Sequence, residues 1–110
     1  MEENMRLLSR SEEIILLTVL KLEGDAYGIS IREHIREATG NEWSFASIYE
    51  PLQKLVRKGY VKKRMAKPTS ERGGRHKFLY EITKEGKLAL IEINNVYKNI
   101  WKDISSESLY

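Results

Sequence analysis

Positive charge is concentrated in one part of this chain, and it is the strongest chemical signal in the sequence. The segment from Lys54 to Lys77 holds ten lysines and arginines but a single acidic residue, Glu71, so its net charge is +9. The rest of the chain holds nine basic and fifteen acidic residues, a net charge of −6. Clustered basic side chains attract phosphates, so this asymmetry is typical of proteins that bind a polyanion. The ten basic residues are Lys54, Arg57, Lys58, Lys62, Lys63, Arg64, Lys67, Arg72, Arg75 and Lys77.

Residues suited to catalysis or metal binding are scarce by comparison. The two histidines, His34 and His76, are far apart, and there is no cysteine. No spacing matches a zinc motif, a nucleophile elbow or a phosphate-binding loop. We therefore predict that the protein is not an enzyme and needs no cofactor. The lack of cysteine also excludes disulfides and fits a reducing cytoplasm.

The length of 110 residues predicts one domain. No apolar run approaches the roughly 18 residues that would span a membrane. The start, MEENMRLLSRSEE, is acidic and interrupted by polar residues, unlike a signal peptide. We expect a cytoplasmic protein without a membrane-embedded part.

The elements that must position the basic segment begin with a strongly apolar helix. Ser9 or Ser11 is suited to cap it, and Ser9 with Glu12 has the spacing of a capping box. Gly24 is a natural stop. Its apolar residues cover most of the circumference of the helix, which predicts that the helix is buried on more than one side. We expect one side to face its own domain and another to face a partner chain.

A second helix is predicted from a cap at Asp25 to an end at Gly40. His34 lies beside its apolar stripe, as a surface or boundary residue. The inward stripe is predicted to be Tyr27, Ile31, Ile35 and Ala38.

The third helix ends at Gly59, but two starting points are open. Pro51 lacks an amide and fits best in a first turn, which favours Ser47 as the cap; alternatively, the helix starts at Ser44 and bends at Pro51. Alternation around Trp43 predicts a short strand before it. The buried stripe is Ile48, Leu52, Leu55 and Val56, and the residues away from it are Tyr49, Gln53, Lys54, Arg57 and Lys58.

Two strands, residues 60–68 and 76–83, and a long last helix complete the chain. The loop between the strands carries Gly73 and Gly74, whose permissive backbone suits a hairpin turn. Thr83 is the predicted cap of a helix that runs to about Ile104. Its apolar residues step by three and four, as in a short coiled-coil seam, although part of the stripe also packs on its own domain. The predicted dimerisation residues are Leu90, Ile93, Tyr97, Ile100 and Ile104.

This order predicts a mainly α fold with a small β-hairpin, namely a winged helix-turn-helix with a long C-terminal dimerisation helix. Within a single domain of residues 1–110, we assign 8–83 to the winged helix, 84–104 to the dimerisation helix and 105–110 to a flexible tail. The chain resembles the PadR family of bacterial transcription regulators, especially its short members with one C-terminal helix. The segments that carry the resemblance are YGISIREHI, ASIYEPLQKLVRKGYV and GGRHKFLYEITKEGK.

The resemblance implies a homodimeric repressor that binds double-stranded operator DNA. By this analogy the third helix enters the major groove and Tyr49 contacts the phosphate backbone. In many relatives a proline directly follows that tyrosine, whereas here Glu50 lies between Tyr49 and Pro51. The wing glycines would allow close approach to DNA, although an ordinary hairpin turn also explains them. The predicted DNA-binding residues are Ser44, Ser47, Tyr49, Gln53, Lys54, Arg57, Arg72, Gly73, Gly74, Arg75 and Lys77.

Tyr97 and Trp101 lie one helical turn apart on the same side of the last helix. Some short relatives hold aromatic or cationic compounds between aromatic rings at the dimer centre, so the resemblance implies a small-molecule effector at these two residues. The alternative is that both rings fill the dimer core. Two other functions stay open, a protein-interaction module and DNA binding without sequence preference. The +9 segment argues against the first, and Gln53 and Lys54 have side chains able to read base edges.

Overall fold

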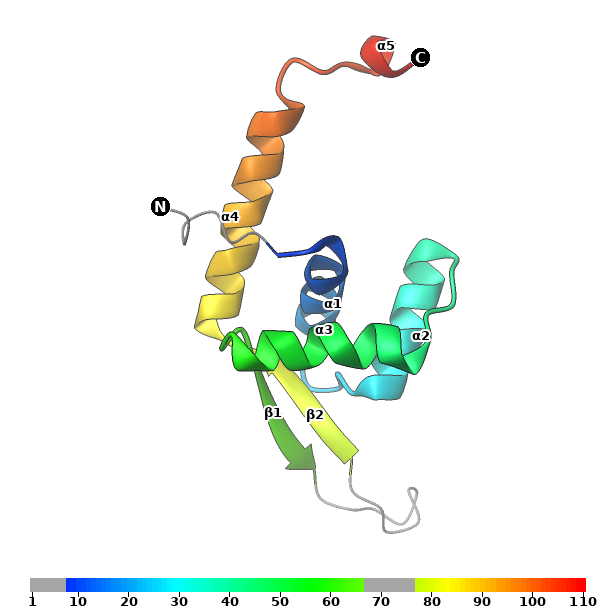
Figure 1. Cartoon of the computed structure of the whole chain (residues 1–110), viewed down its shortest axis with the longest axis vertical. Helices are drawn as coiled ribbons and strands as arrows, with labels where there is room; N and C mark the ends of the chain where they lie inside the picture. The colour runs from blue at the N-terminus through cyan, green and yellow to red at the C-terminus, as the bar shows by residue number, and fades with distance from the viewer. Residues whose placement is uncertain (1–7, 67–76) are drawn as a thin grey trace.

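The computed structural model describes residues 8–66 and 77–110, which form a mainly helical fold with a two-stranded antiparallel sheet (Figure 1). This is the predicted winged-helix class. The elements in chain order are α1 (Arg10–Lys21), α2 (Gly28–Thr39), α3 (Phe45–Arg57), β1 (Val61–Ala66), β2 (Lys77–Ile82), α4 (Lys84–Trp101) and α5 (Ser106–Leu109).

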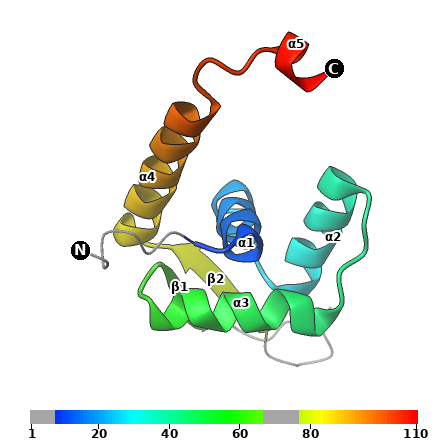
Figure 2. The same ribbon diagram turned by 45° about the horizontal axis from the view of Figure 1, so that its top comes forward.

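Helix α1 begins with the predicted capping box. The Ser9 hydroxyl accepts from the Glu12 amide at 3.1 Å, and the Ser9 amide donates to the Glu12 carboxylate at 2.8 Å. The helix ends at Lys21, and Gly24 takes a φ of +89° in the turn that follows. Helices α2 and α3 and the sheet pack around α1, which is buried on more than one side as predicted, while Leu17 is 39% exposed and the side expected to meet a partner chain stays a prediction. Figure 2 shows α1 enclosed between α2, α3 and α4.

The predicted cap of α2 was wrong. The N-cap is Tyr27, and Asp25 lies outside the helix. The Tyr80 amide of β2 donates to the Ala26 carbonyl at 2.8 Å, which holds this stretch against the sheet and delays the helix. Gly40 ends the helix as predicted, at φ +77°. Ala38 is exposed, contrary to prediction, because the buried residues of α2 end at Ile35 and its last turn is exposed throughout.

Helix α3 begins at the earlier of the two predicted starts. The Ser44 hydroxyl accepts from the Ser47 amide at 3.1 Å, so Ser44 is the cap. The strand expected around Trp43 was wrong, because this cap starts the helix at Phe45. Pro51 lies inside the helix, where its missing amide leaves the carbonyl of Ser47 without a helical partner. Ser47 is exposed, so water can satisfy that carbonyl.

The core lies between α1, α2, α3 and the sheet. In the sheet Val61 pairs with Ile82 at one end and Ala66 with Lys77 at the other. Leu79 and Tyr80 of β2 are both buried, on opposite faces of the strand, and Tyr80 belongs to the core, whereas most of β1 is exposed. The largest fully buried side chains are Ile15, Leu16, Val19, Ile31, Ile35, Ile48, Leu52 and Leu55.

Helix α4 leaves the sheet and rises away from the other helices (Figure 1). Thr83 caps it as predicted, since its hydroxyl accepts from the Gly86 amide at 3.1 Å. The helix ends at Trp101 and not near Ile104, because Asp103 adopts a φ of +68° and turns the chain. The tail beyond it contains the short helix α5.

Candidate nucleic-acid interface

The outer side of α3 carries polar and charged side chains along a shallow hollow. Glu50, Lys54 and Arg57 are exposed, and Gln53 is half-buried. The hollow has a volume of about 430 Å³ and is lined by these four residues and Tyr49. Lys54 and Arg57 have no carboxylate within ion-pair distance among the described residues, so their charges are free to meet a ligand.

A second cavity of about 410 Å³ continues from this hollow toward the start of α2 and the sheet. Lys63 of β1 and Lys77 of β2 contribute ammonium groups, each above an aromatic ring: Lys63 lies 4.3 Å from the Phe78 centroid and Lys77 lies 3.8 Å from that of Tyr27. No acidic residue is among the described residues that line it, so both charges are uncompensated. The lining consists of Tyr27, Gly28, Tyr49, Gln53, Lys63, Lys77, Phe78 and Tyr80.

Tyr49 joins the two hollows. Its hydroxyl lies against Gly28 at the start of α2, in space that a Cβ on residue 28 would need. Its ring stacks on Phe45 with 6.0 Å between centroids. The hydroxyl is therefore held at the mouth of the second cavity. Behind it, burial raises the pKa of Tyr80 and the neighbouring Tyr49 adds to the effect, which a contact with Gln53 only partly offsets.

Two cations of the basic segment are neutralised within the fold. The Lys58 ammonium lies 3.0 Å from Glu12, and Arg64 lies 3.0 Å from Glu81 across the sheet. Glu12 is only 5% exposed. Lys58 therefore ties the end of α3 to the start of α1 and does not belong to the free cations at the hollows.

The sequence analysis missed Phe45 and Arg32. Phe45 is the first residue of α3 and is 45% exposed. The Arg32 guanidinium lies 4.7 Å from its ring centroid and donates to the Trp43 carbonyl at 2.8 Å. Because apolar and polar residues alternate around Trp43, the sequence pattern placed Phe45 in a strand. The signal that identifies it is its place directly after a serine suited to cap a helix.

A sequence profile of the "Transcriptional regulator PadR-like family" matches residues 16–92, from within α1 to within α4. The chain belongs to the PadR family. It is accordingly a transcription regulator by family. Among curated proteins, no match was found.

Solved structures of other regulators resemble this PadR-family chain. A transcriptional regulator from Clostridium thermocellum is 26% identical with a TM-score of 0.67, over 84% of this chain and 87% of that one. A PadR family transcription regulator from Clostridium difficile is 28% identical with a TM-score of 0.66, over 89% and 98%. Bacillus subtilis PadR, in complex with operator DNA, shares the fold at 24% identity and a TM-score of 0.59, over 74% of this chain and 45% of that one.

The predicted DNA-binding residues of this PadR-family regulator fall into two groups. Those from Ser44 to Arg57 lie on α3 or at its cap, and Lys77 joins them across the second cavity. The other predicted residues, Arg72, Gly73, Gly74 and Arg75, lie outside the described residues. The same is true of residues 67–68, at the end of the first predicted strand, and of residue 76, at the start of the second.

The predicted dimerisation seam divides along α4. Ile93 is buried in the core of its own chain, and Leu90 and Tyr97 pack against that core. Ile100 is 62% exposed, and Ile104, beyond the end of the helix, is also exposed. A largely apolar groove of about 400 Å³ lies between α1 and α4, and its lining is Glu13, Leu17, Leu20, Leu90, Ile91, Ile93, Asn94 and Tyr97.

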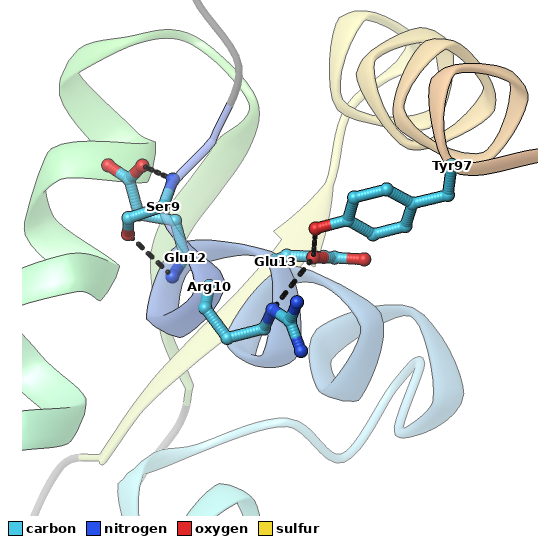
Figure 3. A network of polar contacts seen from close by, with 5 residues as sticks. All are labelled: Ser9, Arg10, Glu12, Glu13 and Tyr97. Atoms are coloured by element: carbon cyan, nitrogen blue, oxygen red, sulfur yellow. Dashed lines mark hydrogen bonds and ion pairs between the residues drawn. The ribbon is translucent and has the colours of Figure 1, made fainter. Parts of the chain in front are cut away.

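Tyr97 is attached to α1 of the same chain (Figure 3). Its hydroxyl donates to Glu13 at 2.9 Å, and the Arg10 guanidinium lies 5.8 Å from its ring centroid while pairing with Glu13 at 3.8 Å. This network links α4 to the first turn of α1. Trp101, the other predicted effector residue, is 56% exposed at the end of α4.

Within residues 8–66 and 77–110, no helix is both long and apolar enough to cross a bilayer. The same part of the chain contains no cluster of three metal-ligating side chains.

Proposed function

We propose that this PadR-family regulator binds double-stranded DNA sequence-specifically as a homodimer and represses transcription in the cytoplasm. The observation that supports this most is the continuous surface formed by the outer side of α3 and the second cavity. It carries the free cations Lys54, Arg57, Lys63 and Lys77. The Bacillus subtilis protein of the same fold was solved with operator DNA. A protein-interaction module would have no need of these uncompensated charges.

Each part of the surface has a distinct role in this proposal. Tyr49, Lys63 and Lys77 contact backbone phosphates at the mouth of the second cavity, with a hydroxyl donor and two ammonium groups. Gln53 and Lys54 face the major groove, where an amide can pair with adenine and an ammonium with guanine. At the capped start of α3, the hydroxyls of Ser44 and Ser47 lie close to the DNA backbone. Arg57 contacts the DNA backbone from the last residue of α3. The predicted wing residues Arg72, Gly73, Gly74 and Arg75 extend the contact with DNA.

Glu50 supports sequence-specific over indiscriminate binding. It places one exposed carboxylate in the middle of the α3 hollow. A carboxylate repels phosphates and so weakens purely electrostatic attachment, but it can accept from the amino group of cytosine. A surface evolved only to hold any duplex would gain affinity from a neutral residue at this position.

The homodimer in this proposal uses α4. Ile91 lines the groove between α1 and α4, and the apolar residues Ile100 and Trp101 are exposed farther along the helix. The α4 helix of a second copy binds in that groove in this proposal. Under two-fold symmetry, each copy then covers the apolar lining of the other copy's groove with the exposed apolar residues of its own α4. The two α3 helices then stand about one DNA turn apart, ~34 Å.

An aromatic or cationic effector at the dimer centre completes the proposal. Trp101 is exposed and available for stacking, whereas the Tyr97 hydroxyl is already bonded to Glu13. A ligand that draws Tyr97 away from Glu13 would change the angle of α4 and the spacing of the α3 helices. In a Trp43→Phe background, titration with planar cationic dyes should quench Trp101 emission and lower operator affinity. No quenching by any dye contradicts the effector.

The test of DNA binding is its salt dependence. Fragments of the source genome selected by the purified protein should bind with a log K against log salt slope of roughly −5 to −9. Lys63→Gln with Lys77→Gln removes about four phosphate contacts per dimer and should flatten the slope by roughly 3 to 4, since each phosphate contributes ~0.9. Lys84→Gln with Lys87→Gln, at two exposed positions of α4, removes the same net charge and should leave the slope unchanged. A slope near zero for the unmodified protein contradicts DNA binding.

A further inference from the structure

Phe45 presents an aromatic ring to solvent at the first residue of α3. It is 45% exposed and does not belong to the hydrophobic core. Exposing a large apolar side chain forgoes the free energy that its burial would contribute. The position also matters, because a recognition helix meets base edges with its N-terminal residues.

The ring is held in place without being buried. Tyr49 stacks on one side at 6.0 Å between centroids, with 22° between the ring planes. The Arg32 guanidinium lies 4.7 Å from the ring centroid. Arg32 is itself fixed, since its Nε donates to the Trp43 carbonyl at 2.8 Å and its Nη2 lies 3.6 Å from the Glu42 carboxylate. An aromatic group restrained in this way loses little conformational entropy when a ligand covers it.

The chemistry of the ring determines which part of DNA it fits. A phenyl ring has no hydrogen-bond donor for phosphate and no partner for the polar edges of adenine, guanine or cytosine. The 5-methyl group of thymine is the apolar feature of the major groove.

We propose that Phe45 selects thymine at one position of each half-site by covering its 5-methyl group. This proposal rests on the proposed DNA-binding function and assigns to it a residue that reads a base without hydrogen bonds.

The experiment removes the methyl group from the DNA. The tightest duplex selected from a random pool is remade with each thymine replaced in turn by deoxyuridine, and the affinities are measured by fluorescence anisotropy. At one symmetric position, the loss should be about 4-fold for one half-site and roughly 15-fold for both, the factors expected for methyl groups no longer removed from water. Phe45→Ala should bind the thymine and deoxyuridine duplexes equally, and Phe45→Leu should retain part of the difference.

A matched control is Phe78→Ala. Phe78 is also an exposed ring beside a cation, 41% exposed and under Lys63, but it lies on the sheet in the second cavity, where its loss can change the overall affinity. This variant should keep the full thymine preference whatever its overall affinity. Thermal melting establishes that each variant is folded, and Phe45→Leu serves if Phe45→Ala is not.

Two results would overturn the inference while DNA binding stands: unmodified protein that tolerates deoxyuridine at every position, or a Phe45→Ala variant that remains sensitive to it. Loss of the thymine preference in Phe78→Ala would also overturn it. An unmodified protein with no salt-sensitive affinity for any duplex would instead refute the proposed function, and this inference with it.

Discussion

Replacing Glu12 with glutamine should lower the free energy of unfolding by about 1–2 kcal/mol at neutral pH. The Glu12 carboxylate accepts from the Ser9 amide at 2.8 Å and lies 3.0 Å from the Lys58 ammonium. Removing one partner of a fully buried ion pair costs ~3–5 kcal/mol. More than a third of the Lys58 side chain is exposed and can turn to water, so the smaller value of a charge-assisted hydrogen bond, ~1.5–3 kcal/mol, is the upper limit. Glutamine retains part of this bonding.

The measurement is thermal unfolding followed by circular dichroism. A loss of about 1–2 kcal/mol corresponds to a decrease in Tm of roughly 5–15 °C for a domain of this size. Glu12→Ala should be worse by a further ~0.5–2 kcal/mol, because it also removes the acceptor that completes the capping box. Glu23→Gln is the matched control: it removes an exposed carboxylate just past α1 and should melt like the unmodified protein.

The stability that Glu12 contributes should depend on pH in a defined direction. Burial raises the pKa of Glu12, but hydrogen bonds from Ser9 and the charge of Lys58 outweigh burial, so the pKa is lowered from its ordinary value of 4.5. The contribution is therefore fully present above that value and is lost as the pH falls through the lower value of the folded protein. The gap between the unmodified protein and Glu12→Gln should be full at about pH 6 and narrow below about pH 4. Equal melting at neutral pH, or a gap that persists unchanged in acid, would refute the reasoning.

Three further outcomes are expected. Lys58→Gln should lower Tm but leave the salt slope of DNA binding unchanged, because its charge is paired within the fold; a slope flattened by more than one unit would make Lys58 a phosphate contact. Gly28→Ala should displace the Tyr49 hydroxyl, which is the end of a 38%-exposed side chain and can turn aside, so the free energy of unfolding should change by less than ~1 kcal/mol in chemical unfolding; a larger loss would mean that the Tyr49 ring cannot move. Ile91→Asp with Ile100→Asp should give a monomer of unchanged Tm in sedimentation, and a persistent dimer would remove α4 from the interface.

Helix ends that depend on neighbouring residues could be predicted from the sequence. The Ser9–Glu12 capping box, the Thr83 cap and the Gly40 end each involve partners within four positions along the chain. Local hydrogen bonds and left-handed φ angles are encoded in short patterns, so they survive in almost any tertiary context. The order of elements followed from these ends and from apolar periodicity.

Two of the predictions that were wrong, the cap at Asp25 and the burial of Ala38, involve residues far away in the sequence. Asp25 does not cap α2 because the backbone of Tyr80, more than fifty residues later, holds the preceding stretch against the sheet. Ala38 is exposed because no other element covers the last turn of α2, where residues 36–39 are all exposed. No local pattern records how far a neighbouring element extends.

The sequence by itself determined that the charge of this protein is uneven, that its helices begin and end where they have caps, and that the chain has the elements of a winged helix. These are properties of composition and of short-range bonding. Only the tertiary structure decided which of the clustered cations remain free. Lys58 and Arg64 meet carboxylates, whereas Lys63 and Lys77 converge on a cavity whose described lining residues include none. The partner of Lys58 is 46 positions away in the chain, and a charge separated by that distance is neutralised only when folding brings the two side chains together.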